Sequence, residues 1–330
     1  MWGELRQVMS GTTSMSGSGA GIGLLRNVDV GSGNLGLGQP TVEYDTFPLG
    51  DSGGEWRTDD CSYPDLPSLS ILSEDAWTPH VSEGIDAEAR NEFLCMSTEE
   101  RGGRDVTENN GAFIHGIGLL AIDGRDMAAG GTSLIWSPRS NISLYGHTAP
   151  VTMLDTQGVR IAIGTDWMPS GSMNMIRELR CADYLNQFHF GTHFSSYQLW
   201  KMATIQAAEA LAIDDAIGSL RPGLLADIAI YDSQDGDDYF AALIESEVQD
   251  VTLVMRAGAV LYGESDLIDA VTESGACDEV PGDVCGAQKR VCLSNDIGKS
   301  YQSLAGANGS SYPLFFCDLP VLEPTCVPSR

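Results

Sequence analysis

Short apolar runs alternate with polar and helical stretches from residue 72 onward. Four of these runs, near residues 75–81, 111–117, 132–137 and 160–166, have the length and composition of buried parallel strands. Helical or turn-rich segments separate them, as they do in a β/α repeat. The pattern therefore predicts an α/β fold built on a parallel sheet.

Two helices are predicted behind the last of these strands. Apolar side chains recur at helical spacing within residues 171–187 and again within residues 195–212. Serines precede both segments, and a serine oxygen can accept a hydrogen bond from the first free N–H groups of a helix. The candidate N-caps are Ser170 and Ser172 for the first helix and Ser195 or Ser196 for the second.

The pattern changes after residue 217, where strands follow one another without helices between them. A glycine-containing turn precedes one short strand near residue 228, and residues 251–263 have the pattern of two short strands around a tight Ala-Gly turn. We therefore expect a separate small β-domain over residues 218–265, followed by a Cys-rich extension over residues 266–330.

The first 70 residues are rich in glycine and in loop-forming residues. Residues 17–23 contain alternating glycines, which are also found in dinucleotide-binding loops. Such a loop needs a strand before it and a helix after it, and neither pattern is present here. We therefore interpret this segment as a flexible loop.

Composition and charge narrow the classes of function. With 42% hydrophobic and 19% charged residues, the 330-residue chain has the balance of a globular protein. Its net charge of −28 would repel phosphate groups, which argues against a nucleic-acid partner. No apolar run reaches the roughly 18–20 residues of a membrane span, and the segment after Met1 lacks the pattern of a signal peptide. A small-molecule substrate is the expected partner.

The chain contains eight cysteines, and five of them fall in the last 54 residues. This density favours disulfides, and so an extracytoplasmic compartment, periplasmic or secreted. A metal site in the tail is the alternative, but none of the five forms a C-x-x-C pair. Cys61 and Cys95 are candidates for a further bridge. Cys181 lies in a helical pattern and is expected to be a buried free thiol.

Residues with acid–base or ligand chemistry stand at the ends of the apolar runs. They are His80 and Glu83 after the first run, His115 at the end of the second, and Asp166 at the end of the last. The carboxyl ends of parallel strands meet at one edge of a sheet, so these side chains are expected to share a pocket. Imidazole and carboxylate together suit a metal site with a general acid or base.

Each of these residues also has a structural interpretation. His80 and Glu83 could form an exposed loop pair, and His115 could be a hydrogen-bonded core residue. Asp166 could cap the helix that follows, although the nearby serines already suit that role. A buried strand-end carboxylate has to be paired, metal-bound or facing a cavity, which favours a functional interpretation of Asp166.

Two further residues follow the third run. Arg139 and Asn141 could fix a polar substrate by hydrogen bonds, and turn chemistry after Pro138 is the alternative. The remaining histidines are expected on the surface or in loops: His147, His189 and His193.

The strand-end residues and the stretch that contains Arg139 and Asn141, taken in their order along the chain, resemble the motifs of the amidohydrolase superfamily. The resemblance is to its aminohydrolase and imidazolonepropionase-like members in particular. His80-x-x-Glu83 is similar to that family's strand-five histidine and nearby glutamate, and His115 to its strand-six histidine. Gly-Thr-Asp166 resembles the strand-eight aspartate. The stretch 137–141 is similar to an Asn-Pro-x-Ser-Asn motif after strand seven, and the strands between residues 223 and 260 resemble the family's return to a small β-sandwich domain.

The resemblance implies a fold, a cofactor and a reaction. The fold would be a (β/α)8 barrel, and the reaction would be hydrolysis of non-peptide carbon–nitrogen bonds, such as deamination or opening of a cyclic amide or amidine. A divalent metal, with zinc expected and iron as the alternative, would be held by His80 and Asp166. Asp166, His115 and Glu83 would be catalytic, and Trp167 would join Arg139 and Asn141 in binding substrate.

The sequence departs from the family pattern at one point. The family's first strand carries a His-x-His pair, and this chain contains none. The expectation is therefore an incomplete barrel of about strands 3–8 over residues 1–217, with Phe47–Asp51 ending strand four. This pattern predicts a chain truncated at its N-terminus, with a missing N-terminal segment, or one polypeptide of a split protein. A homo-oligomer is a further expected partner.

Two other functions remain open at this point. A chain without the His-x-His ligands could be a catalytically inactive fragment or a binding module of an amidohydrolase-like protein. A secreted structural protein held together by the Cys-rich tail is the third alternative.

Overall fold

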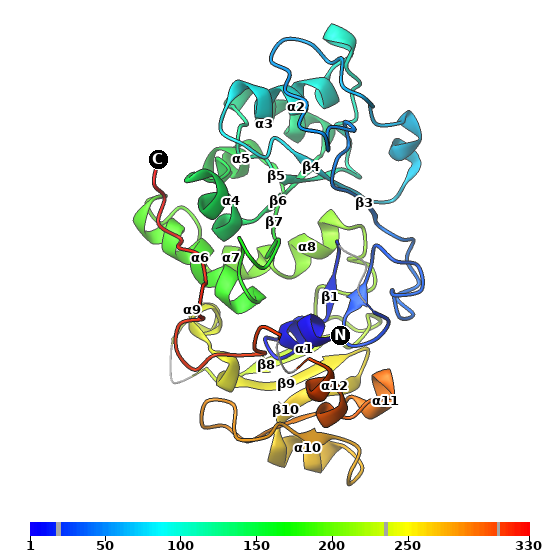
Figure 1. Ribbon diagram of the computed structural model, residues 1–330, viewed down its shortest axis with the longest axis vertical. Coiled ribbons are helices and arrows are strands. Elements are labelled where there is room, and N and C mark those ends of the chain that lie inside the picture. The colour runs from blue at the N-terminus through cyan, green and yellow to red at the C-terminus, as the bar shows by residue number, and fades with distance from the viewer. Residues whose placement is uncertain (18–20, 234–236, 309–310) are drawn as a thin grey trace.

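Two five-stranded sheets organise the computed structural model, which describes residues 1–17, 21–233, 237–308 and 311–330. Figure 1 shows the first sheet among helices in the upper half and the second sheet in the lower half. The strands are β1 (Ser14–Met15), β2 (Arg26–Asn27), β3 (Glu43–Asp45), β4 (Trp77–Val81), β5 (Ala112–His115), β6 (Ser133–Trp136), β7 (Ile161–Ile163), β8 (Ile228–Tyr231), β9 (Val251–Arg256), β10 (Ala259–Glu264), β11 (Asp278–Glu279) and β12 (Lys289–Val291). The α-helices are α1 (Trp2–Val8), α2 (Ala87–Ser97), α3 (Ala121–Gly130), α4 (Pro138–Tyr145), α5 (Val151–Gln157), α6 (Met175–Phe188), α7 (Ser196–Met202), α8 (Ile205–Ala210), α9 (Tyr239–Glu245), α10 (Ser265–Val271), α11 (Ser294–Ile297) and α12 (Tyr301–Ala307).

The first sheet is parallel throughout, in the order β3-β4-β5-β6-β7. The strands from β4 to β7 fall within the four apolar runs, so the predicted α/β class with a parallel sheet is confirmed. Their carboxyl ends are in register, since Val81 pairs with His115 and Trp136 pairs with Ile163. In the residues described, the sheet is open, with β3 and β7 as its edges.

The edge strand β3 corrects one sequence prediction. We expected the strand next to His80 to end at Phe47–Asp51, but the paired segment ends at Asp45. Phe47 is half exposed, and its amide donates a hydrogen bond to the Asp45 carboxylate at 3.0 Å. This local turn takes the chain away from the sheet before the segment at which the sequence suggested the strand would end.

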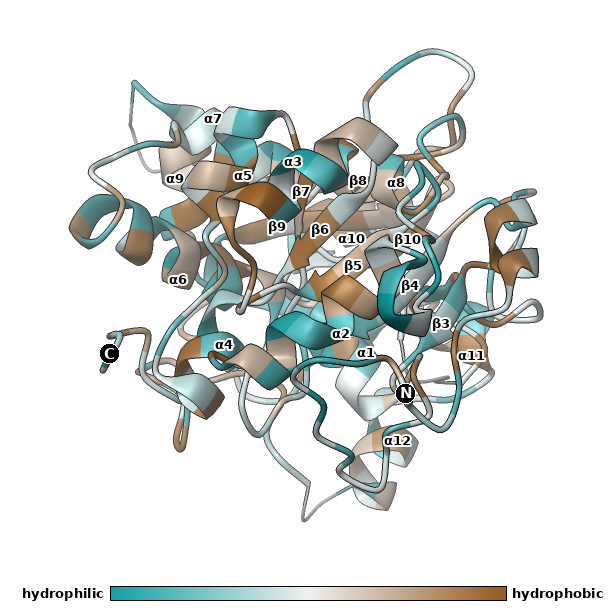
Figure 2. Ribbon diagram, turned by 90° about the horizontal axis from the view of Figure 1, so that it is seen from above, coloured by the Kyte–Doolittle hydropathy of each residue, from teal (hydrophilic) through white to brown (hydrophobic). Residues whose placement is uncertain are grey.

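Aromatic side chains fill the core under the parallel sheet. Phe93 on α2, Phe113 on β5 and Trp136 on β6 are completely buried, and Phe93 and Phe113 meet edge to face at 6.3 Å. Figure 2 shows the hydrophobic β5 and β6 in the middle of the view, surrounded by helices. Full burial of each such side chain contributes about 1.5–3 kcal/mol to folding. The core thus fixes β5, which ends at His115, and β6, which leads into α4 and Asn141.

The second sheet is antiparallel, in the order β11-β12-β10-β9-β8. The predicted hairpin is present: β9 and β10 pair around Ala257 and Gly258, which both have positive φ angles, as a tight hairpin turn requires. Asp227 supports this turn by accepting a hydrogen bond from the Ala257 amide at 2.8 Å, and it forms an ion pair with the buried Arg26.

The N-terminal helix α1 packs against the second, antiparallel sheet and does not belong to the parallel-sheet half of the molecule. Leu5 and Val8 of α1 are completely buried in one cluster with Val251, Val254 and Tyr262. We had expected the first 50 residues to supply two barrel strands, so the position of α1 is a correction. The face of a sheet needs an apolar cover, and α1 provides it here. Residues 18–20 of the glycine-rich segment lie outside the described residues.

All eight cysteines are paired. The bridges are Cys61–Cys95, Cys181–Cys326, Cys277–Cys292 and Cys285–Cys317. The predicted Cys61–Cys95 pair is confirmed. The prediction that Cys181 is a free thiol is wrong: the side chain is buried in α6, as expected, but the end of the chain returns along this helix and brings Cys326 to it.

The C-terminal tail, residues 312–330, connects the second sheet with the helices of the first (Figure 1). It begins at α1, where Arg6 donates to the carbonyl oxygens of Tyr312 and Pro313, each at 2.9 Å. It ends at α4, where the carbonyl oxygen of Gly146 accepts the amides of Ser329 and Arg330 at 2.9 and 3.1 Å. In the described residues, no helix has both the length and the apolar character needed to cross a membrane.

The Cys181–Cys326 bridge should contribute most of the stability that the tail provides. It joins residues 145 positions apart, whereas Cys277–Cys292 joins residues 15 apart. In the chain-entropy model, replacing the long-range pair by serines should lower the free energy of unfolding by about 4–5 kcal/mol, and the control pair by about 3 kcal/mol. Urea denaturation of both double variants tests this, and a larger loss for the control pair would contradict it.

Candidate active site

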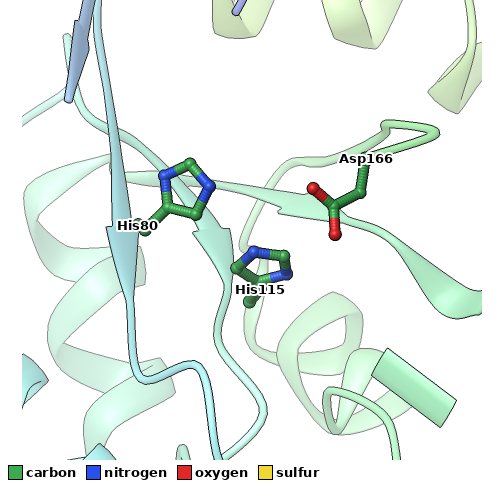
Figure 3. Close-up of side chains that lie close together, drawn as sticks. All are labelled: His80, His115 and Asp166. Carbon is green, nitrogen blue, oxygen red and sulfur yellow. The ribbon is translucent and has the colours of Figure 1, made fainter. Parts of the chain in front are cut away.

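Three side chains from three strand ends meet at the carboxyl edge of the parallel sheet. His80 lies on β4, His115 is the last residue of β5, and Asp166 follows β7 by three residues. One ligand atom from each lies within 4.8 Å of the other two. Figure 3 shows the two imidazoles and the carboxylate pointing toward one another. The structure therefore brings together the three residues that the sequence placed in one pocket.

The backbone at two of these residues is in the left-handed region. His115 has a φ of 77° and Asp166 a φ of 55°. Each non-glycine residue in this region costs of order 1–3 kcal/mol, and such residues concentrate at functional sites. The left-handed turn directs each side chain across the strand ends.

His80 presents one ring nitrogen to the cluster. Its Nδ1 lies 3.2 Å from the carbonyl oxygen of Asp45, which can only accept a hydrogen bond. Nδ1 therefore carries the proton, and Nε2 keeps a free lone pair. The ring of Tyr44 packs edge to face on the imidazole at 5.6 Å. Burial lowers the pKa of His80, which favours the neutral ring that metal ligation requires.

Asp166 is held by Ser140, which itself contacts Ser170. Ser140, in the first turn of α4, donates a hydrogen bond to Asp166 Oδ2, and its hydroxyl lies 2.9 Å from that of Ser170. Ser170 was expected to cap the next helix, but Asn174 caps α6 by accepting a hydrogen bond from the Arg177 amide. Because the helix begins later than predicted, the Ser170 hydroxyl does not cap it and instead contacts Ser140.

His115 is completely buried and contacts Asn141 and Glu83. Asn141 Nδ2 lies 3.1 Å from His115 Nδ1, and Glu83 Oε2 lies 3.5 Å from His115 Nε2. Burial lowers the pKa of His115, so the ring is neutral near pH 7. Asn141 thus acts on His115, whereas the sequence analysis expected it to contact substrate.

Glu83 lies beside the cluster with part of its side chain exposed. Its Oε1 accepts a hydrogen bond from the Tyr145 hydroxyl at 3.1 Å. Burial, and then the nearby negative charge of Asp166, raise the pKa of Glu83 to about 7. The same surroundings raise the pKa of Tyr145, so its hydroxyl stays protonated and remains a donor. A carboxyl group that titrates near neutrality can both give and take a proton.

Arg139 does not reach the cluster, which corrects its predicted role. Its Nε donates to Ser172 Oγ at 2.6 Å, and the rest of the guanidinium contacts the Pro324 carbonyl oxygen and the Glu323 carboxylate of the tail. Ser172, a second expected N-cap, is thus a partner of Arg139. A buried arginine needs such partners, because its charge is costly to bury alone.

Trp167 follows Asp166 in the chain, and 69% of its surface is exposed. The three histidines that we assigned to the surface or to loops are all exposed: His147, His189 and His193.

Several site residues gave no recognisable signal in the sequence. Tyr44 comes from the short edge strand, and Tyr145 comes from the end of α4. Ser140 stood within the motif after the third run but was not singled out. Only the position of α4 across the strand ends shows that its residues contact Asp166 and His115.

Comparisons with known proteins identify the family of this chain. The model of the amidohydrolase family matches residues 79–261, which is more than half of the chain. A 5-methylthioadenosine/S-adenosylhomocysteine deaminase of Teredinibacter turnerae is 36% identical over 114 residues, or 34% of this chain and 26% of that protein. A deaminase of the same name from Caldicellulosiruptor saccharolyticus is 29% identical over 187 residues, or 53% of this chain and 42% of that protein.

The chain therefore matches less than half the length of either relative. Among solved structures, atrazine chlorohydrolase from Arthrobacter aurescens TC1, complexed with zinc, aligns with a TM-score of 0.54 at 18% identity. The alignment covers 78% of this chain and 71% of that chain, and at this identity the likeness concerns the fold alone. From the family match and the geometry at the strand ends, we conclude that the chain belongs to the amidohydrolase family.

Proposed function

We propose that this protein is a metal-dependent hydrolase of non-peptide carbon–nitrogen bonds, acting on an amino group attached to a nitrogen heterocycle. The observation that carries the proposal is the convergence of His80, His115 and Asp166 within 4.8 Å. Family membership supports the reaction class, and the named activity of the relatives, a deaminase of adenosine derivatives, supports the substrate class. The barrel architecture of the family remains part of this proposal.

The donor atoms suit a divalent metal. His80 Nε2 has a free lone pair, Asp166 offers a carboxylate, and imidazole nitrogen with carboxylate oxygen is a donor set that zinc prefers. The ligand atoms lie within 4.8 Å of one another, so both residues would be within reach of a single ion. We assign His80 and Asp166 as ligands and zinc as the metal, with iron as the alternative.

A cation at this position supplies Lewis acidity, which lowers the pKa of water to about 7. The residues of the chain transfer the protons and contact the substrate. Asp166 takes the proton of the attacking water and passes it to the departing nitrogen. His115 donates a hydrogen bond to the atom that gains negative charge. Glu83, with its raised pKa, protonates a ring nitrogen, and Trp167 covers the heterocycle at the rim.

We also propose an extracytoplasmic location. All eight cysteines form disulfides, and such bridges persist in oxidising compartments. The net charge of −28 fits a small neutral or cationic substrate better than a nucleic acid.

A second candidate function is binding without turnover. The observation that favours it is the ligand count: the metal-type cluster of the described residues holds three side chains, and the sequence contains no His-x-His pair. Catalytic zinc sites usually have three protein ligands and one open position. If His115 is a donor and not a ligand, the chain offers two. Zinc stoichiometry and turnover, measured on the same preparation, separate the two functions.

Replacing Asp166 by Asn should abolish most turnover. The amide keeps the shape of the carboxylate but cannot take the proton of water, and loss of a general base typically costs about 10²–10⁴-fold. The measurement is ammonia release from a panel of aminated heterocycles. The control is His193→Gln, because His193 is an exposed histidine paired with Asp155. An Asn variant as active as the parent chain would refute the role of Asp166.

Ser140→Ala should weaken zinc binding by roughly 10–100-fold, the usual effect of losing a group that orients a metal ligand. Ser140 donates to Asp166, whereas Ser143 lies on the exposed side of the same helix. Ser143→Ala is therefore the matched control and should bind zinc as the parent does. Calorimetric zinc titration of the three chains measures these affinities. Equal affinities in the Ser140→Ala variant and the parent would contradict the proposal that Ser140 orients Asp166 as a ligand.

A further inference from the structure

A directional chain of hydrogen bonds ends at His115. It starts at Trp136 on β6, whose Nε1 donates to Thr148 Oγ1 at 2.7 Å. Thr148 in turn donates to Asn141 Oδ1 at 3.3 Å, and Asn141 Nδ2 lies 3.1 Å from His115 Nδ1. All four side chains belong to residues that are at most 4% exposed, so water does not compete for these bonds.

The direction of the chain follows from its first member. An indole N–H can only donate, so the Thr148 oxygen accepts from Trp136 and has its own proton left to donate. That proton goes to Asn141 Oδ1, which orients the amide with its NH2 group toward His115. With the amide reversed, the Thr148 hydroxyl proton would have no acceptor among the described residues.

An amide NH2 group facing Nδ1 determines where the histidine proton lies. Nδ1 has to accept this hydrogen bond, so it carries no proton. A doubly protonated ring would place two donors against each other. The proton of the neutral ring is therefore on Nε2, on the side of Glu83 Oε2 at 3.5 Å and of the metal-type cluster.

We propose that Trp136, Thr148 and Asn141 form a relay that holds His115 as its Nε2–H tautomer, and so make it a hydrogen-bond donor and not a metal ligand. The three are positioning residues, because each acts on the substrate only through His115. The donor role rests on the proposed function; the tautomer itself does not.

The neighbouring His80 has the opposite tautomer. Its Nδ1 faces the Asp45 carbonyl, which leaves Nε2 unprotonated. The two rings lie 5.1 Å apart, between centroids, with their inward nitrogens in different states (Figure 3). One imidazole thus offers a lone pair to a metal, and the other offers an N–H to the atom that gains charge in the reaction.

The test is a ¹⁵N NMR spectrum of the histidine side chains in the full chain, recorded near pH 7 without added metal. The chain has five histidines, and a His115→Gln variant identifies the signals of His115 by their loss. We expect a downfield, unprotonated Nδ1 and an upfield, protonated Nε2 for His115, and the reverse for His80. A protonated Nδ1 at His115 would overturn the proposal.

Two variants and one control variant test the relay itself. Asn141→Asp replaces the donor by an acceptor and should move the proton of His115 to Nδ1, exchanging the two ¹⁵N positions. Thr148→Val removes the group that orients the amide and should give averaged signals, whereas Thr148→Ser keeps the hydroxyl and should restore the parent spectrum. If the aspartate variant fails to fold, the Thr148 pair still decides. An unchanged His115 signature in Thr148→Val would contradict the relay.

Zinc added to the parent chain separates this proposal from the proposed function. If both hold, the His80 Nε2 signal shifts while the His115 Nε2–H signal persists. Signals of His80 that do not move would count against the metal site and leave the tautomer assignment intact. Loss of the His115 Nε2–H proton on zinc binding would show that His115 is a ligand, which would overturn the relay's role.

Discussion

The first turn of α4 holds the site together, because two consecutive residues on it secure groups from two different strands. Ser140 donates to Asp166, and Asn141 contacts His115. Pro138 opens the helix, and its fixed φ suits the first helical position. The Asn141–His115 contact is buried, so loss of either partner there would leave a polar group unsatisfied at a cost of about 1–3 kcal/mol, whereas the Ser140–Asp166 contact is only partly buried. The geometry of the strand ends therefore depends on where this helix lies.

Buried charges in turn fix the position of α4. The backbone amide of Arg139 donates to Glu178 of α6 at 3.0 Å, and the Arg139 side chain contacts the tail residues Glu323 and Pro324. Glu178 is completely buried, and burial raises its pKa to about 7. Arg177 adds a bidentate ion pair with Glu323. Because an isolated charge is costly in this interior, each member holds the others in place.

The sequence predicted those parts of the site that depend on local pattern. His115 and Asp166 end short apolar runs, and the carboxyl ends of parallel strands meet whatever the details of the loops. The four central strands and the hairpin at Ala257-Gly258 were found in the same way. Their periodicity and turn chemistry are contained within a few neighbouring residues.

The parts that depend on distant contacts could not be predicted. Nothing near Cys181 indicates Cys326, since disulfide connectivity does not follow from spacing. Arg139 had the right residue type for binding substrate, and only the returning tail shows that its charge is already paired. The short α1 has too few residues to reveal which sheet it covers. In each case the partner comes from more than a hundred residues away in the chain.

The tail also affects the order in which the protein matures. Its last contacts, Cys181–Cys326 and the two amides on Gly146, involve residues that are translated after every strand of both sheets. Each strand can emerge and pair during translation, but the tail contacts that support α4 form only after the last residues are translated. Oxidation of that bridge is therefore a late step, and the surroundings of the candidate site reach their final form only once the chain has met an oxidant.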